Sequence, residues 1–216
     1  MRIRPLAVPS QHGHLEALLW YPPSPPLATA LVCHLHPRLG GNMHNNTVYR
    51  MAKAWTSAHV TSLRFNFQGV GKSTGGLREA RGLEEGLGEL EDAQSALDFL
   101  HAQHPSLPLF ASGFSFGART ALALALKEPR VQRVLAVGVG VDFFDMRFVA
   151  QLKKPIAFVH AENDEFGKLQ HLQALARQVQ APTRLFVVPH AAHLFLGHMQ
   201  SLEVQLAQAI AWLGEG

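Results

Sequence analysis

The feature of the sequence that most constrains its fold is a repeated alternation of apolar runs with segments of helical spacing. Several apolar runs are continuous, which is typical of parallel strands buried on both faces. Between them, apolar residues recur every three or four positions, which predicts helices. Strand–helix–strand order of this kind predicts an α/β protein with a mostly parallel central sheet and helices on both faces. The predicted strands are Ala28–Leu35, Thr61–Phe65, Leu107–Phe114, Val131–Val139, Pro155–His160 and Arg184–Val188; helical stripes run along Val48–Trp55, Leu87–Leu100, Leu169–Val179 and Leu202–Leu213.

The length of the chain favours one domain. Its 216 residues lie close to the usual size of a single domain, and no internal repeat or linker divides them. The proline-rich piece Tyr21–Pro26 is too short for a linker, and we interpret it as a turn between two early strands. We therefore predict a single domain over residues 1–216.

Composition excludes several classes of partner. Only 16% of residues are charged, the net charge is +3, and the basic residues are scattered, so we expect no nucleic-acid partner. The chain has one cysteine, Cys33, and no apolar run approaches the roughly 20 residues of a membrane span. The first residues also lack the apolar stretch of a signal peptide. We expect a cytoplasmic protein without a membrane partner.

One segment places a serine between a predicted strand and a predicted helix. The run Leu107–Ala111 leads into Gly113-Phe114-Ser115-Phe116-Gly117, and an Ala/Leu-rich helix is predicted from Arg119 to Leu126. In a Gly-x-Ser-x-Gly pattern the serine lies on a strained turn, where a side chain at either glycine would collide with a neighbouring strand or helix. The turn exposes the Ser115 hydroxyl and directs the Phe116 N–H towards the same point. This pattern predicts a nucleophile at Ser115, with a structural turn and a capping serine as the alternative.

A nucleophilic serine needs a base, and two histidines follow the strand predicted at Arg184–Val188. His190 comes directly after Pro189, whereas His193 lies further along the loop that must fold back over the serine. Site residues in parallel sheets gather at the carboxyl ends of the strands. We therefore predict that His193 is the base and that His190 ends the strand.

The base in turn needs a carboxylate that orients it. In proteins with a nucleophilic serine on a strand–turn–helix of this kind, called a nucleophile elbow, the chain order is serine, acid, histidine. Asp164 follows the strand predicted at Pro155–His160 and has enough loop to reach His193. We predict Asp164 as the acid. Glu162 in the same loop and Asp142 after the preceding strand remain alternatives.

Further segments accompany the serine motif and carry a family resemblance. They are His34-Leu35-His36-Pro37, Gly40-Gly41-Asn42-Met43-His44-Asn45 and the stretch from Arg64 to Ser73. With the elbow, they resemble the lidless, dienelactone-hydrolase-like branch of the α/β-hydrolase superfamily, and more narrowly its small bacterial predicted hydrolases. The resemblance runs from about residue 28 to the C-terminus. Leu35 and Gln68 depart from it, since these relatives often have proline and arginine there.

The resemblance implies an α/β-hydrolase fold and a carboxylesterase-type serine hydrolase. Aligning residues 34–37 with the usual His-Gly-x-Pro pattern nominates the His36 backbone N–H as the second oxyanion donor beside that of Phe116. The short stretch Asp142–Lys154 has room for a short helix and for no cap domain. We expect a shallow substrate pocket lined by Phe114, Met43, Phe143 and Phe144. The alternative for the apolar side chains of the short stretch, Phe143, Phe144, Met146 and Phe148, is that they pack against the core.

The expected substrate is a small ester or thioester, cleaved through an acyl-enzyme without a cofactor. The 13 histidines form no metal-binding spacing, so we expect no metal. Gly69–Thr74 imitates part of a phosphate-binding loop, Gly-x-x-x-x-Gly-Lys-Ser. The first glycine of that pattern would stand at position 66, which is Asn66, and Gly75-Gly76 would break the helix that must follow. A peptidase or lactonase on the same triad, and a non-catalytic binder of small molecules, remain the alternative functions.

Overall fold

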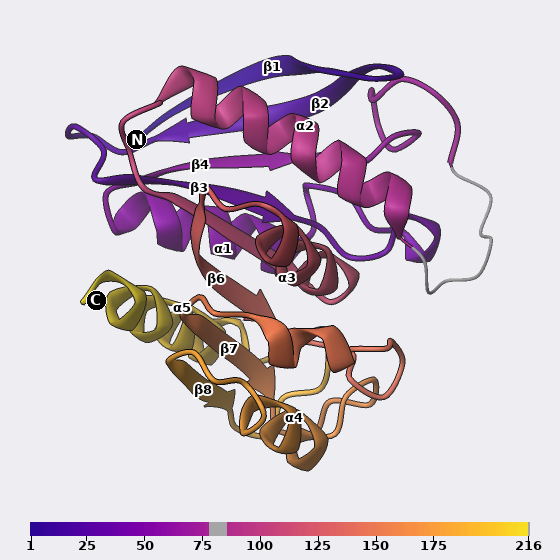
Figure 1. Cartoon of the computed structure of the whole chain (residues 1–216), viewed down its shortest axis with the longest axis vertical. Coiled ribbons are helices and arrows are strands. Elements are labelled where there is room, and N and C mark those ends of the chain that lie inside the picture. The colour runs from indigo at the N-terminus through magenta and orange to yellow at the C-terminus, as the bar shows by residue number, and fades with distance from the viewer. Residues whose placement is uncertain (78–85, 216) are drawn as a thin grey trace.

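The structure is a computed structural model that describes residues 1–77 and 86–215. In this part of the chain, one eight-stranded sheet has the order β1-β2-β4-β3-β5-β6-β7-β8 (Figure 1). β2 pairs antiparallel with β1 and with β4, whereas all pairs from β4 to β8 are parallel. This confirms the predicted α/β class. The strands are β1 (Arg2–Ser10), β2 (Gly13–Tyr21), β3 (Ala28–Cys33), β4 (Val60–Phe65), β5 (Leu109–Phe114), β6 (Val131–Val137), β7 (Ile156–Ala161) and β8 (Thr183–Val188).

Helices cover both faces of the sheet, and each face has its own hydrophobic core. Side chains of α1 and α5, such as Trp55 and Leu206, form one core with the sheet. Side chains of α2, α3 and α4, such as Leu97, Leu122 and Leu172, form the other. The helices are α1 (Asn46–Ser57), α2 (Leu87–Gln103), α3 (Phe116–Lys127), α4 (Leu169–Ala176) and α5 (Met199–Gly214), with short 3₁₀ helices η1 (Pro37–Leu39) and η2 (Arg147–Gln151).

Helix α1 shows how local sequence sets an element. The Asn45 side chain caps it, because Oδ1 accepts from the backbone N–H of Thr47 at 2.9 Å. Val48, Met51 and Trp55 form a stripe along the buried face. Full burial of each such apolar side chain stabilises the folded state by about 1.5–3 kcal/mol. The cap and the stripe together fix where α1 begins and which face it buries.

The sequence-based prediction omits β1, and it implies β2 only as the strand before the predicted turn at Tyr21–Pro26. β1 is an edge strand whose side chains are mostly exposed, so it lacks the apolar pattern by which a buried strand is found. The predicted strand ends also differ: β3 ends at Cys33, before Leu35, and β5 begins at Leu109. Helix α3 begins at Phe116, earlier than Arg119, because Ser115 itself is its N-cap residue.

The parallel part of the sheet brings the predicted site residues to one edge. Ser115 follows β5, Asp164 follows β7 and His193 follows β8. Because these strands run in the same direction, their carboxyl ends meet at the same edge. No helix within the described residues has both the length and the apolar character that a membrane crossing requires.

Candidate active site

Ser115 lies on a turn that only a strained backbone can make. Its φ of 57° and ψ of −116° are rarely adopted by a residue with a side chain. A Cβ atom on Gly113 would lie 2.0 Å from the Gly117 carbonyl oxygen, and one on Gly117 would lie 2.4 Å from the Cys33 carbonyl oxygen. Both glycines are therefore sterically required, which confirms the physical reason for the Gly-x-Ser-x-Gly pattern. The turn leaves Ser115 partly exposed beyond β5.

A chain of hydrogen bonds joins the serine to a histidine and a carboxylate. The His193 Nε2 atom lies 2.9 Å from Ser115 Oγ. The His193 Nδ1 atom lies 2.9 Å and 2.8 Å from the two carboxylate oxygens of Asp164. Because a carboxylate only accepts hydrogen bonds, Nδ1 carries the ring proton, and the lone pair of Nε2 faces the serine hydroxyl. This arrangement can remove the proton of Ser115.

Packing holds the His193 ring in this orientation. The ring stacks on Phe114 at a centroid distance of 5.2 Å and contacts Phe166 at 4.8 Å. The His193 N–H donates to Glu165 Oε2 at 3.0 Å. Gly138, just after β6, leaves the space that these two rings occupy. A Cβ there would lie 2.8 Å from the Phe114 ring and 3.5 Å from His193 Cε1.

The acid loop is fixed by a second buried histidine. Asp164 Oδ1 accepts from the N–H groups of Phe166 and Gly167 at 2.9 Å and 3.1 Å. His160 Nε2 lies 2.6 Å from the Gly167 carbonyl oxygen and therefore donates to it. Burial lowers the pKa of His160, against an opposing effect of the Asp164 carboxylate, so this ring is neutral at neutral pH. His160 thus closes the loop that presents Asp164.

The alternative acid and base residues are engaged elsewhere. The His190 N–H donates to Glu162 Oε2 at 2.7 Å, and the His190 ring lies 3.4 Å from the same carboxylate. Asp142 accepts from the Lys168 N–H at 2.8 Å and pairs with the His171 ring. The structure therefore brings neither Glu162 nor Asp142 to the His193 ring.

His34 orients the loop that carries the nominated second oxyanion donor. His34 Nε2 accepts from the Phe67 N–H at 3.2 Å, so its Nδ1 carries the proton and donates to the Leu35 carbonyl oxygen at 2.6 Å. Burial lowers the pKa of His34 to about 4, which keeps the ring neutral. In a trans peptide the carbonyl oxygen and the following N–H point in opposite directions. Holding the Leu35 oxygen against His34 therefore turns the His36 N–H the other way.

The two nominated oxyanion donors belong to neighbouring residues. The His36 ring packs against the Phe116 ring at a centroid distance of 4.7 Å. Phe116 is the first residue of α3, and an N–H in the first turn of a helix has no acceptor within that helix. The N-terminus of α3 also favours negative charge. Both features suit an oxyanion beside Ser115.

The residues predicted to line the substrate pocket divide into two groups. Phe114 and Met43 are 0% and 1% exposed, and Phe144 is 7% exposed, so these three contribute to the interior. The Phe114 ring stacks on the His193 ring, whereas the Met43 N–H donates to the Asn66 side chain. Phe143 alone of the four presents a large exposed surface.

Sequence reasoning missed several contributors to the site. Gly138, His160, Glu165 and Phe166 were not singled out. Phe166 follows Asp164 closely, and an aromatic residue beside a predicted site acid is the signal that could have found it. Gly138 offered only a glycine after a predicted strand, which is too common to be specific.

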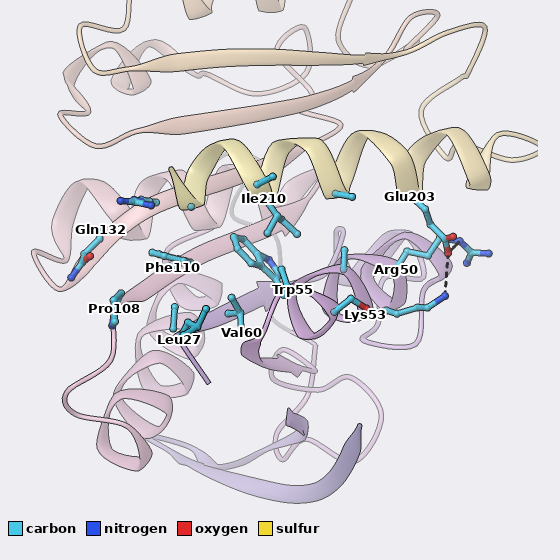
Figure 2. A pocket seen from close by; sticks show the side chains of 18 residues that line it. Leu27, Arg50, Lys53, Trp55, Val60, Pro108, Phe110, Gln132, Glu203 and Ile210 are labelled. Atoms are coloured by element: carbon cyan, nitrogen blue, oxygen red, sulfur yellow. Dashed lines mark ion pairs between the residues drawn. The ribbon is translucent and has the colours of Figure 1, made fainter. Parts of the chain in front are cut away.

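A cavity lies away from these residues. It has a volume of about 610 Å³ and lies between α1 and α5 (Figure 2). Ala28 and Val60, the first residues of β3 and β4, line it, which places it near the amino ends of the strands. At one end of the cavity, Arg50 and Lys53 pair with Glu203. The serine turn lies at the opposite ends of the strands, so the cavity is no part of the site.

Metal binding finds no support in the described residues. In residues 1–77 and 86–215, no cluster of three or more His, Cys, Asp or Glu side chains could hold a metal ion. Gly69–Thr74 forms turns and does not run into a helix, unlike a phosphate-binding loop.

Cys33 is fully buried in β3, and burial raises the pKa of its thiol.

Known proteins share this fold. A structure of a serine hydrolase homologue from Coxiella burnetii is 29% identical, with a TM-score of 0.86 over 95% of this chain and 96% of that one. A serine hydrolase without a lid from Xanthomonas campestris is 26% identical, with a TM-score of 0.86 over 100% and 97%. An uncharacterised protein of Rickettsia prowazekii is 33% identical over 171 residues, 77% of this chain and 69% of that protein. The family model of the alpha/beta hydrolase domain matches residues 36–211, and the chain belongs to this family.

Proposed function

We propose that this hydrolase is a serine esterase that cleaves small carboxylic esters or thioesters. The observation that carries the proposal is the hydrogen-bonded series of Ser115, His193 and Asp164 at the carboxyl edge of the sheet. A serine hydroxyl is a weak nucleophile unless an adjacent base takes its proton. The distance of 2.9 Å between Nε2 and Oγ suits that proton transfer.

In the proposed first half-reaction, His193 Nε2 takes the proton of Ser115 while Oγ attacks the carbonyl carbon. The carbonyl oxygen becomes an oxyanion, which the N–H groups of Phe116 and His36 stabilise. Collapse of this intermediate breaks the bond to the alcohol or thiol. His193 Nε2 returns the proton to that leaving group, and the acyl group remains on Ser115.

In the second half-reaction, water attacks the acyl carbon and His193 takes its proton. The acid then leaves, and Nε2 returns the proton to Ser115 Oγ. Asp164 keeps the imidazole in the reactive tautomer and stabilises its charged form in both halves. No oxidant, metal or other cofactor enters these steps.

Two alternatives use the same residues differently. A lactonase or peptidase would pass through the same acyl-enzyme, so the leaving group alone separates it from an esterase. A non-catalytic binder would form no acyl-enzyme. The complete hydrogen-bonded set of Ser115, His193 and Asp164 favours catalysis over binding, because a binder need not keep all three.

The test is covalent labelling with a fluorophosphonate, followed by hydrolysis of an ester, a thioester, a lactone and a dipeptide amide. We expect Ser115→Ala to abolish labelling and to lower kcat by about three orders of magnitude or more, as the loss of a triad member does. Ser95→Ala is the matched control, since Ser95 lies on α2 and only bonds the Glu91 carbonyl. Labelling of Ser115→Ala at the wild-type rate would contradict the proposal.

A further inference from the structure

Aromatic side chains surround the serine turn in an unbroken series of contacts. Neighbouring rings in the series have centroid distances between 4.7 Å and 6.0 Å. The series begins at the nominated oxyanion loop and ends at the nominated base. We call it the aromatic collar; its members in order are His36, Phe116, Phe144, Phe143, Phe166 and His193.

Only two members of the collar are exposed. Phe143 is 41% exposed and Phe166 is 37% exposed, whereas Phe116 and Phe144 are 1% and 7% exposed. The other rings are buried against their neighbours and present little surface to a ligand. Phe143 and Phe166 are therefore the members of the collar that present aromatic surface to a ligand.

Backbone hydrogen bonds hold both exposed rings in place. The Phe166 N–H donates to Asp164 Oδ1 at 2.9 Å, and the Phe166 carbonyl accepts from the Asp142 N–H at 3.1 Å. The Phe143 N–H donates to the Gly140 carbonyl at 3.0 Å. These bonds order the backbone that carries each ring, so the two segments need little further ordering when a ligand binds.

The position of Phe166 indicates which half of an ester it meets. In the proposed mechanism His193 Nε2 returns its proton to the leaving oxygen, so that oxygen must come within about 2.6–3.2 Å of Nε2. The Phe166 ring centroid lies 4.8 Å from the His193 ring centroid. In the same mechanism the oxyanion is held by the N–H groups of Phe116 and His36, and not by His193. Atoms just beyond the leaving oxygen therefore lie near the His193 ring, and Phe166 and then Phe143 are the exposed rings next to it.

We infer that Phe143 and Phe166 form the subsite for the alcohol half of the substrate, and that this half carries an aryl or benzyl group. The inference rests on the proposed esterase function and deepens it. The two rings are nearly perpendicular, at 86°, so a third ring can meet one of them face on and the other edge on. Such aromatic contacts are favourable beyond the area that they bury, which an aliphatic ring of the same size does not match.

The first experiment compares two pairs of esters that differ only in ring type. Benzyl acetate and cyclohexylmethyl acetate place the ring on the alcohol side. Methyl phenylacetate and methyl cyclohexylacetate place it on the acyl side. Each kcat/KM is divided by the rate of alkaline hydrolysis of the same ester, which removes the difference in chemical reactivity. We expect the benzyl ester to exceed its partner by about two- to tenfold, and the acyl pair to differ by less than twofold.

The second experiment tests whether the two rings cause that preference. We expect Phe166→Leu and Phe143→Leu each to bring the alcohol-side ratio towards one, because leucine keeps apolar bulk but loses the aromatic face. Phe99→Leu is the matched control, since Phe99 is partly buried on α2 and its change should leave the ratio as in the wild type. Ratios within one variant cancel any loss of folded protein.

Three outcomes would overturn the inference. They are a wild-type alcohol-side ratio near one, an aryl preference on the acyl side instead, and a preference that survives both phenylalanine variants. If the chain hydrolyses the esters in a Ser115-dependent way but shows one of these outcomes, the inference fails and the esterase proposal stands. If no ester is hydrolysed through Ser115, both fail together.

Discussion

At the scale of the residue, two histidines in one loop have different surroundings. The His193 side chain is 5% exposed and hydrogen bonds with both Ser115 and Asp164. The His190 side chain is 83% exposed and lies against Glu162. Both have the same chemistry in isolation. Their contacts alone decide which one can accept the proton of Ser115.

We predict that His193→Ala lowers kcat for p-nitrophenyl acetate by about three orders of magnitude or more, because Ser115 then has no base. His190→Ala should change kcat by less than about twofold, since an exposed ion pair of this kind contributes little. Steady-state kinetics with both variants measures this, and circular dichroism checks that each is folded. Loss of activity in His190→Ala with full activity in His193→Ala would reverse the assignment.

At the scale of the element, the connection between β6 and β7 limits what can cover the site. Residues 138–155 contain the 3₁₀ helix η2 and turns. Apolar side chains of this segment, such as Val149 and Leu152, pack into the core. No cap therefore arises in this segment. The fold in this respect matches the lidless structure from Xanthomonas campestris.

This connection leads us to predict a preference for short acyl chains of roughly two to six carbons. Each buried methylene is worth about 0.8 kcal/mol, but a long acyl tail gains this only where an apolar wall covers it. The predicted walls Phe114 and Met43 are interior residues. The measurement is kcat/KM for p-nitrophenyl esters of increasing acyl length, below their micelle thresholds. A value that rises steadily to twelve carbons would reveal an apolar channel and contradict the prediction.

At the scale of the whole molecule, buried neutral histidines link folding to pH. Burial lowers the pKa of His34 from 6.5 to about 4 and also lowers that of His160. In the unfolded chain both rings take up a proton as the pH falls below about 6.5. The folded state does not take up these protons until a lower pH, so acid favours the unfolded state.

We predict that the free energy of unfolding falls as the pH decreases from about 6.5 to about 4, with a contribution from His34 of up to about 3 kcal/mol. Urea unfolding at intervals between pH 8 and pH 4.5 measures this. The comparison is with His34→Gln, which keeps a donor and an acceptor but does not titrate, and whose stability should fall less steeply. Equal slopes in the two proteins would contradict the prediction.

A separate loss of stability belongs to more acid conditions. The hydrogen bond from the Arg130 side chain holds the pKa of Glu128 at about 2, below its usual 4.5. The contribution of Glu128 is complete above about 4.5 and disappears as the pH falls towards 2. The window above pH 4.5 therefore isolates the histidines from this carboxylate.

The sequence by itself determined the order of the elements and the serine turn, because both depend on neighbours along the chain. Apolar periodicity predicted the buried strands from β3 to β8, and the spacing of Gly113 and Gly117 around Ser115 predicted the turn. The same reasoning missed β1, because an exposed edge strand carries little apolar pattern.

Only the tertiary structure decided which side chains meet at the serine and which surfaces remain open. Ser115 and His193 are 78 residues apart, and His193 and Asp164 are 29 apart. Position in the loop favoured His193 over His190 and Asp164 over Glu162, but their contacts are visible only in the folded chain. Burial likewise divided Phe114, an interior support, from Phe143, an exposed wall. The physical reason is that hydrogen bonding and burial depend on distances between residues that only the folded sheet brings together.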